Sequence, residues 1–146
     1  MKVVHTEIEI NAGTERVWNV LIDFEKYDQW NPFINKIVGR AVVGTKIEIH
    51  IETRGDKNRK YEPTVTKVEP SRELRWLGRS LIPGFLKGEH IFTIEQLQSK
   101  QVRFIHREVF DGFLTSLFGK SLDSDVKKGF EEMNKALKVR VEHTWS

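Results

Sequence analysis

The sequence predicts an α+β fold in which a curved antiparallel sheet of six to seven strands wraps around one long C-terminal helix. Three observations predict it: a helical period over residues 121–144, a period of two that recurs between residues 34 and 110, and two short helical segments after the first strand. Strands joined by short turns pair antiparallel, and helices segregated from the strands indicate the α+β class. With 146 residues, the chain is expected to form a single domain over residues 1–146.

The first strand is expected over residues 3–10, where apolar and charged side chains alternate. Asn11 or Thr14 then offers a cap for a helix over residues 15–23. A second short helix is expected over residues 24–28, and it ends before Pro32 because proline disfavours helical backbone at the residue before it.

The period of two returns in six further segments. The strands are expected over residues 34–43, 46–53, 61–68, 73–78, 87–97 and 102–110. Residues 54–60 are polar and basic and are expected to form a turn, and Pro63 suggests an edge or a bulge. The last two strands are joined at residues 98–101, which predicts a hairpin.

The helix over residues 121–144 has one apolar stripe, and its length of roughly 35 Å at 1.5 Å per residue matches that of the strands. The stripe consists of Val126, Phe130, Met133, Leu137 and Val141. A helix with a single stripe needs a long apolar surface to lie against, and the concave face of the sheet supplies it.

Composition excludes several classes of protein. The 24 Lys and Arg are nearly balanced by 21 Asp and Glu, so the net charge of +3 does not favour nucleic-acid binding. There is no cysteine, and no His-Glu-x-x-His spacing, so no metal site or cofactor is expected. No signal peptide and no apolar run of about 18 residues is seen. We therefore expect a cytoplasmic protein with at most transient membrane contact.

The hairpin carries the most specific functional signal. Even-numbered residues of its two strands share one face, which gathers His90, Phe92, Ile94, Phe104, His106, Glu108 and Phe110. One register places His90 opposite Glu108, and the neighbouring register places Phe92 there. If this face is concave, an apolar pocket holds one carboxyl group and two imidazoles.

Three interpretations of this group stay open: a structural buried pair, a ligand-orienting pair, or an acid–base pair of Glu108 and His90. Trp30 and Trp76 either line the same pocket or fill the core. From the long helix, Phe130, Met133 and Leu137 are expected to face the pocket, and Asn134 either reaches it or lies on a solvated flank. The apolar connectors 81–86 and 113–118 either gate the pocket or cap the core.

Several blocks resemble the START-like, or SRPBCC, superfamily, in its polyketide cyclase/dehydrase and lipid transport branch. They are residues 10–33, 88–95, 107–112 and 129–142, with Gly13 in place of the usual proline. The resemblance implies a helix-grip fold with a deep cavity between the concave face and the last helix, which holds a small hydrophobic or amphipathic molecule.

This resemblance leaves three functions to compare, since a fold does not fix chemistry. The first is a carrier or sensor that binds a hydrophobic ligand, lipid included. The second is a cyclase/dehydrase-type enzyme that uses Glu108 and His90, and the third is a protein-interaction or co-chaperone role. The sequence favours binding, because it shows no set of nucleophile, base and orienting group.

Overall fold

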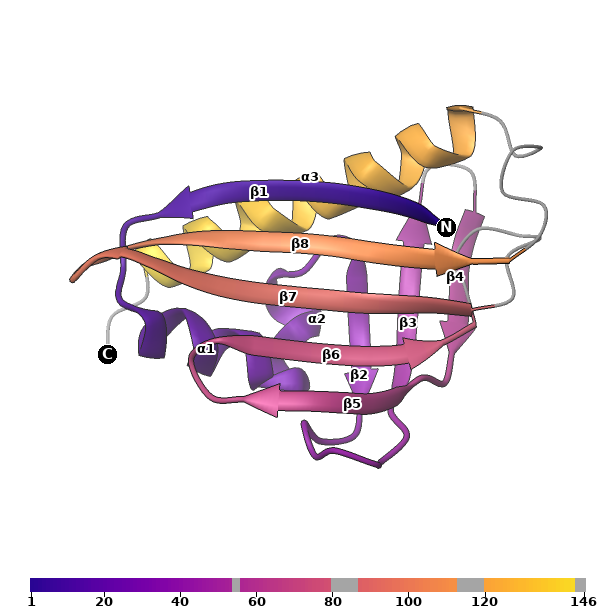
Figure 1. The fold of residues 1–146 in the computed structure, drawn as a ribbon, viewed down its shortest axis with the longest axis horizontal. Helices are drawn as coiled ribbons and strands as arrows, with labels where there is room; N and C mark the ends of the chain where they lie inside the picture. The colour runs from indigo at the N-terminus through magenta and orange to yellow at the C-terminus, as the bar shows by residue number, and fades with distance from the viewer. Residues whose placement is uncertain (54–55, 80–86, 113–119, 144–146) are drawn as a thin grey trace.

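The computed structural model describes residues 1–53, 56–79, 87–112 and 120–143 (Figure 1). In chain order the elements are β1 (Lys2–Ile10), α1 (Thr14–Ile22), the 3-10 turn η1 (Phe24–Lys26), α2 (Tyr27–Trp30), β2 (Ile34–Val38), β3 (Glu48–Thr53), β4 (Asp56–Tyr61), β5 (Thr64–Glu69), β6 (Glu73–Gly78), β7 (Lys87–Gln98), β8 (Gln101–Asp111) and α3 (Lys120–Glu142). The predicted α+β helix-grip fold is confirmed.

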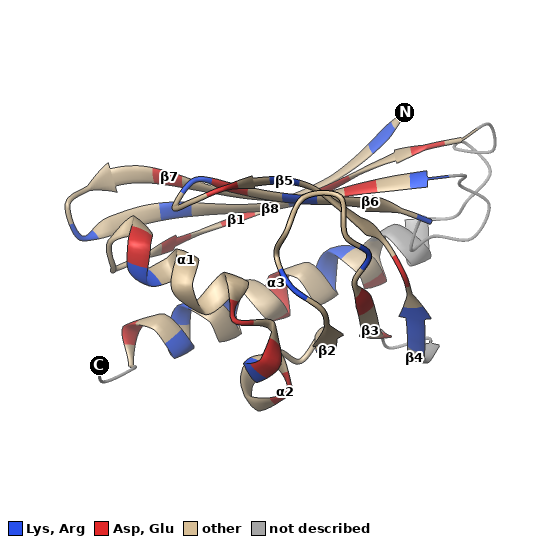
Figure 2. Ribbon diagram, turned by 90° about the horizontal axis from the view of Figure 1, so that it is seen from below, with Lys and Arg blue, Asp and Glu red and all other residues tan. Residues whose placement is uncertain are grey.

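The strands form two antiparallel sheets. One has the order β1-β8-β7-β6-β5, and the other has the order β2-β3-β4. Figure 2 shows α1 and α3 below the five-stranded sheet, with β2, β3 and β4 on the same side. The helix α3 contacts β1, β8 and β3, so it is held between the two sheets.

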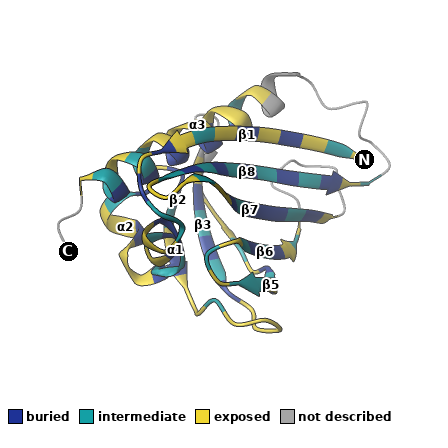
Figure 3. Ribbon diagram, turned by 60° about the vertical axis from the view of Figure 1, so that its left-hand side comes forward, coloured by how far each residue is buried: buried dark blue, intermediate teal, exposed yellow. Residues whose placement is uncertain are grey.

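The apolar stripe of α3 is buried as the spacing predicted. All of Val126, Phe130, Met133, Leu137 and Val141 are within the core, whereas the opposite flank of the helix is exposed (Figure 3). The strands β7 and β8 alternate between buried and more exposed positions over most of their lengths. The core therefore lies between the inner face of the five-stranded sheet, α3 and the inner face of β2 and β3.

The start of α1 differs from the sequence prediction. Gly13 is the residue before the helix, and no side chain caps it, so neither Asn11 nor Thr14 is the cap. The reason is that Asn11 serves as a tie between distant elements: its backbone N–H donates to Glu142 at 2.7 Å, and its side-chain oxygen accepts from Gln101 at 3.4 Å. The predicted helix over residues 24–28 is η1 followed by α2.

The strand count also differs, because one segment that was predicted to be a turn is a strand. The basic segment expected to be a turn is mostly β4, which pairs with β3 through His50 opposite Lys60. Charged side chains suit it because β4 is an edge strand. Glu62 and Pro63 belong to neither strand and separate β4 from β5. Proline has no N–H to donate to a ladder, so it interrupts strand pairing here. The described residues therefore form eight strands in two sheets.

The predicted strand over residues 34–43 ends early, at Val38. Gly39 has φ +130°, where an L side chain is strained, and its backbone lies against Ile47. The chain turns away from β3 at this glycine, so only residues 34–38 pair.

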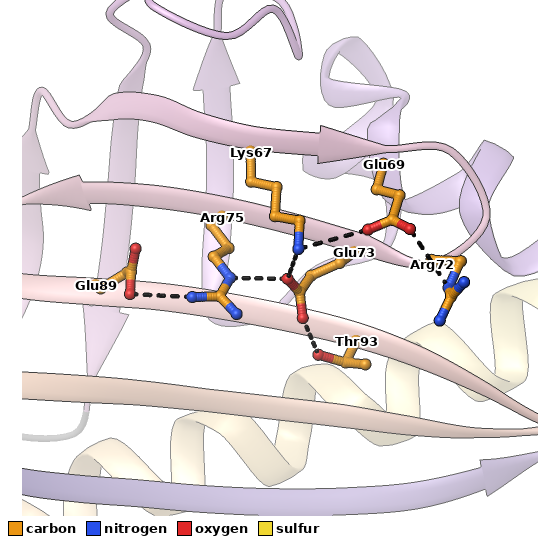
Figure 4. A network of polar contacts seen from close by, with 7 residues as sticks. All are labelled: Lys67, Glu69, Arg72, Glu73, Arg75, Glu89 and Thr93. Carbon is orange, nitrogen blue, oxygen red and sulfur yellow. Dashed lines mark hydrogen bonds and ion pairs between the residues drawn. The ribbon is translucent and has the colours of Figure 1, made fainter.

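The outer face of the sheet carries a network of charges on β5, β6 and β7 (Figure 4). Glu73 is its centre: its carboxylate accepts from Lys67 at 2.8 Å, from Arg75 at 2.8 Å and from Thr93 at 3.0 Å. Partial burial raises the pKa of Glu73, but these hydrogen bonds outweigh it and hold the pKa at about 2, below the usual 4.5. The network therefore stabilises three neighbouring strands through one carboxylate.

Glu73→Gln is expected to lower the free energy of unfolding at pH 7 by roughly 2 kcal/mol. A carboxyl with a lowered pKa stabilises the fold above its unfolded pKa and loses that contribution as the pH falls from about 4.5 to about 2. The difference between wild type and variant should therefore shrink over that range, as measured by urea unfolding. Glu69→Gln is the matched control, because Glu69 is 42% exposed against 12% for Glu73. Equal losses of stability in the two variants would contradict the conclusion that Glu73 is the centre of the network.

Candidate functional site

The hairpin of β7 and β8 places two of the predicted side chains opposite each other. His90 pairs with Glu108, and Phe92 pairs with His106, which is the first of the two predicted registers. His90, His106 and Glu108 are all buried, at 3% exposure or less. The even-numbered face of the hairpin is therefore the inner face of the sheet.

A chain of polar contacts crosses the core from the sheet to α3 and back to β1. Nε2 of His90 lies 2.7 Å from Nε2 of His106, and Nδ1 of His106 lies 2.9 Å from Oδ1 of Asn134. The Asn134 amide donates to the Thr6 hydroxyl at 2.9 Å, and that hydroxyl donates to the backbone carbonyl of His106 at 2.8 Å. At the other end, Oε1 of Glu108 lies 3.3 Å from Nδ1 of His90.

The direction of the protons in this chain follows from its last link. A backbone carbonyl only accepts, so Thr6 uses its one hydroxyl proton on His106 and must accept from the N–H of Asn134. The amide oxygen of Asn134 then faces Nδ1 of His106, which must carry a proton. A neutral His106 has a bare Nε2, so His90 donates its Nε2–H to it.

Burial sets the charge of these groups. It lowers the pKa of His90 to about 3, and it lowers the pKa of His106 well below its usual value. It raises the pKa of Glu108 from 4.5 to about 8. At neutral pH the acid proton therefore stays on Glu108, and both imidazoles are uncharged. Among the described residues, Oε1 has no aligned hydrogen bond, and the contact of 3.3 Å is the longest link of the chain.

Aromatic rings surround the two imidazoles. The ring of His106 stacks on Phe130 of α3 with centroids 4.0 Å apart and an interplanar angle of 12°. His90 lies 4.8 Å from Phe92 and 5.2 Å from Trp76, again between ring centroids. The polar chain is thus enclosed by apolar surface, which is why its members cannot exchange their partners for bulk water.

A small cavity lies at the Glu108 end of the chain, where β6 ends and β7 begins. Its volume is about 10 Å³, about the space that one water molecule needs. The residues that line it are Ile49, Tyr61, Pro63, Trp76, Gly78, Arg79, Gly88, His90 and Glu108. Among the described residues, this pocket has the size of a single water molecule, and the deep cavity implied by the resemblance stays a prediction.

Comparison with known proteins decides the family. A family model described as polyketide cyclase/dehydrase and lipid transport matches residues 1–142. The chain belongs to this family. No match to it was found among curated protein sequences.

Solved structures of the START-like fold resemble this family member over nearly their whole lengths. A START superfamily protein from Mycobacterium smegmatis has a TM-score of 0.76 and 21% identity, with 96% of this chain and 97% of that chain covered. The Zhui aromatase/cyclase from Streptomyces sp. R1128 has a TM-score of 0.78 and 15% identity, with 97% and 93% covered. The Aha1 dimer from Colwellia psychrerythraea has a TM-score of 0.72 and 20% identity, with 98% of each chain covered. At these identities the likeness shows the fold.

In this member of the polyketide cyclase/dehydrase family, the side chains that were predicted to line the pocket lie in three different parts of the structure. Trp76, His90 and Glu108 line the small cavity. Phe92, Ile94, Phe104, His106, Phe110, Phe130, Met133, Asn134 and Leu137 are buried in the core that continues from it. Trp30 is only partly buried and packs on Tyr27 at 5.0 Å between centroids, so it lies in the α2 region. The connectors 81–86 and 113–118 lie outside the described residues, so their role in gating the pocket stays a prediction.

Sequence reasoning missed Thr6, which fixes the direction of the polar chain. The available signal was a hydroxyl on the inner, otherwise apolar face of β1, between Val4 and Ile10. It also missed Ile49 and Tyr61, because the partner strands β3 and β4 reach the cavity only through the second sheet. No spacing within one strand reveals such a contact.

Two further features concern the residues that the structure describes, 1–53, 56–79, 87–112 and 120–143. No group of three or more His, Asp or Glu side chains in those ranges is arranged to hold a metal ion. None of the helices in the same ranges is both long and apolar enough to cross a bilayer.

The raised pKa of Glu108 predicts an alkaline loss of stability. A carboxyl whose pKa is raised from 4.5 to about 8 in the fold stabilises it fully below pH 4.5 and loses that contribution as the pH rises through 8. Between pH 6.5 and 8 the free energy of unfolding of the wild type should therefore fall relative to that of Glu108→Gln by about 1 kcal/mol per pH unit, because the variant cannot ionise at this position. The lowered pKa values of His90 and His106 affect the slopes of both proteins alike and cancel in this difference. Chemical denaturation at four pH values measures both, and equal slopes would refute a protonated Glu108.

Proposed function

We propose that this protein binds a small hydrophobic or amphipathic molecule in the interior between the sheet and α3, as a carrier or sensor. The observation that carries the proposal is a buried carboxyl, Glu108, at the edge of an apolar cavity with no aligned hydrogen bond to Oε1 among the described residues. An unsatisfied buried polar atom costs stability, about 1–3 kcal/mol, so a ligand group that forms a hydrogen bond with Oε1 is favoured.

The surroundings of Glu108 support binding. Apolar walls with a few orienting polar groups are typical of small-molecule sites. Here the walls include Trp76 and Ile49, and the polar side chains in the lining are Tyr61, Arg79, His90 and Glu108. The family to which the chain belongs includes lipid transport in its description. A cavity of about 10 Å³ accommodates a guest larger than water only when the guest displaces the surrounding side chains.

A thermal-shift screen with hydrophobic compounds tests the proposal, with native mass spectrometry of the purified protein to detect a bound molecule. A ligand that binds only the folded protein raises its melting temperature. Ile49→Phe fills the cavity wall and should abolish the rise. Ile51→Phe is the matched control, since Ile51 is buried on the same face of β3 but does not line the cavity. The proposal fails if no compound raises the melting temperature, or if both variants respond equally.

A second candidate function is acid–base catalysis of the cyclase/dehydrase kind, favoured by the pKa of Glu108 at about 8. A carboxyl that keeps its proton at pH 7 can act as a general acid. Glu108→Gln should then abolish turnover of a candidate substrate while it leaves the thermal shift by that substrate intact. A carrier shows the same thermal shift with no turnover in either protein.

A further inference from the structure

The loop between β2 and β3, residues 39–47, places apolar side chains at the surface, apart from the site described above. Val42 and Val43 at its tip are 50% and 57% exposed, and Val38 at its base is 51% exposed. They are three of the seven exposed large apolar side chains among the described residues. Figure 1 and Figure 3 show the loop as a projection beyond β5, on the side of the molecule away from α3.

Hydrogen bonds hold this loop in a defined turn, which keeps the valines at the surface. The backbone N–H of Gly44 donates to the carbonyl of Val65 at 2.8 Å, and the N–H of Val65 donates to the carbonyl of Thr45 at 2.9 Å. The Thr45 hydroxyl donates to the carbonyl of Val42 at 2.7 Å and closes the tip. Gly44 has φ +89°, which glycine adopts without strain. A partner that covers Val42 and Val43 would therefore not have to order the loop first.

The charges beside the valines are all positive. Residues 36–46 contain Lys36, Arg40 and Lys46 and no Asp or Glu. All three cations are exposed, and no ion pair joins any of them to another described residue. Figure 2 shows blue and no red along the loop. The surface therefore combines fixed apolar side chains with positive charge that is free to meet an anionic partner.

An anionic bilayer complements both properties of this surface. The neighbouring carboxyl groups of Glu48 and Glu62 lie near Lys60, at 3.5 and 3.7 Å, so they already have a partner. A second copy of the chain, docked by the same surface, would bring like charges together. A nucleic acid would attract the cations but offers little apolar surface to the valines. A bilayer offers an apolar boundary below a layer of lipid phosphates.

We infer that residues 36–46 dock this protein reversibly onto a membrane that contains anionic lipids. Val42 and Val43 enter the boundary between headgroups and acyl chains, and Arg40 and Lys46 lie among the lipid phosphates. So few apolar and basic side chains give weak binding that salt reduces, without stable anchoring. The inference does not rest on the proposed function, because docking needs no guest in the cavity.

Vesicle co-sedimentation of the full chain tests this inference. The partition coefficient should be about tenfold higher on phosphatidylcholine vesicles with about 30% phosphatidylserine than on pure phosphatidylcholine. Val42→Glu combined with Val43→Glu should lower it by about tenfold, because two apolar side chains no longer enter the bilayer. Val139→Glu is the matched control, since Val139 is 58% exposed on α3 and should bind as the wild type does.

A second pair of variants tests the charges. Arg40→Gln combined with Lys46→Gln should remove most of the preference for phosphatidylserine. Lys127→Gln combined with Lys128→Gln removes the same charge from an exposed part of α3 and should leave that preference unchanged. Equal effects of the two pairs would show that net charge alone drives binding, and the inference would be overturned.

Three further results would also overturn it. They are a wild type that binds neither kind of vesicle, a Val42 and Val43 variant that binds as well as the wild type, and a dimer that forms in solution and is lost in that variant. The last result would assign the loop to contact between two copies. The thermal-shift screen of the proposed function is independent of all three, so the two proposals can fail separately.

Discussion

Replacing Gly129 with alanine is expected to lower the free energy of unfolding by about 2 kcal/mol, although alanine is the better helix former by about 1 kcal/mol. Gly129 lies on the buried side of α3, and a Cβ built there would overlap Cδ1 of Phe33. Phe33 cannot withdraw easily, because its ring packs edge-on against Phe130 and its backbone N–H donates to Asn31 at 2.9 Å. The steric overlap with Phe33 therefore costs more stability than the higher helix propensity of alanine contributes.

Urea unfolding of Gly129→Ala measures this loss. Gly13→Ala is the matched control, since a Cβ there meets only the carbonyl oxygen of Ser99 at 3.4 Å, an ordinary contact. The double variant Gly129→Ala with Phe33→Leu should recover part of the loss relative to the sum of the single changes, because the smaller side chain makes room. A Gly129→Ala protein as stable as wild type would show that α3 does not approach Phe33 so closely.

Asn134→Leu is expected to cost about 3 kcal/mol of stability, since it leaves a buried donor without a partner. The Nδ1–H of His106 loses its acceptor, and the Thr6 hydroxyl loses the N–H that it accepts. Both groups are enclosed by the core, so water cannot replace the amide. The change should also alter the imidazole ¹⁵N shifts of His106, because its tautomer is no longer fixed.

A double-mutant cycle with Thr6→Val isolates this link. The two changes together should cost less than the sum of the single losses by about 1 kcal/mol, because each removes the partner of the other. Lys135→Leu is the surface control on the next residue of α3, and it should change stability by no more than about 0.5 kcal/mol. Additive losses for Thr6 and Asn134 would mean that the two side chains are not coupled.

Local periodicity was enough to predict most of the fold. The stripe of α3, the strand Glu73–Gly78 and the hairpin of β7 and β8 all follow from side chains that alternate within one segment. The same alternation placed His90 opposite Glu108 in one of two possible registers, and the structure confirms that one. These features depend on neighbours in sequence, which is why sequence reasoning reaches them.

Features that depend on pairing between distant segments were not predictable. The strand β4 is rich in charge, and only its ladder to β3 makes it a strand rather than a turn. Asn134 was expected either at the pocket or on a solvated flank, and its contacts with Thr6 and His106 bring together β1, β8 and α3. The direction of the polar chain needed a backbone carbonyl whose partner is 100 residues away.

The position of β1 beside β8 has a consequence for synthesis on the ribosome. The strand Lys2–Ile10 is synthesised before its ladder partner among the described strands, Gln101–Asp111, and Thr6 and Asn11 bond to α3 across 128 and 131 residues. Contacts between residues so far apart in sequence make folding slow. The five-stranded sheet also cannot be completed before β8 has been synthesised. The apolar face of Lys2–Ile10 therefore stays uncovered until about 100 further residues have been synthesised, and during this interval the strand is open to wrong pairing.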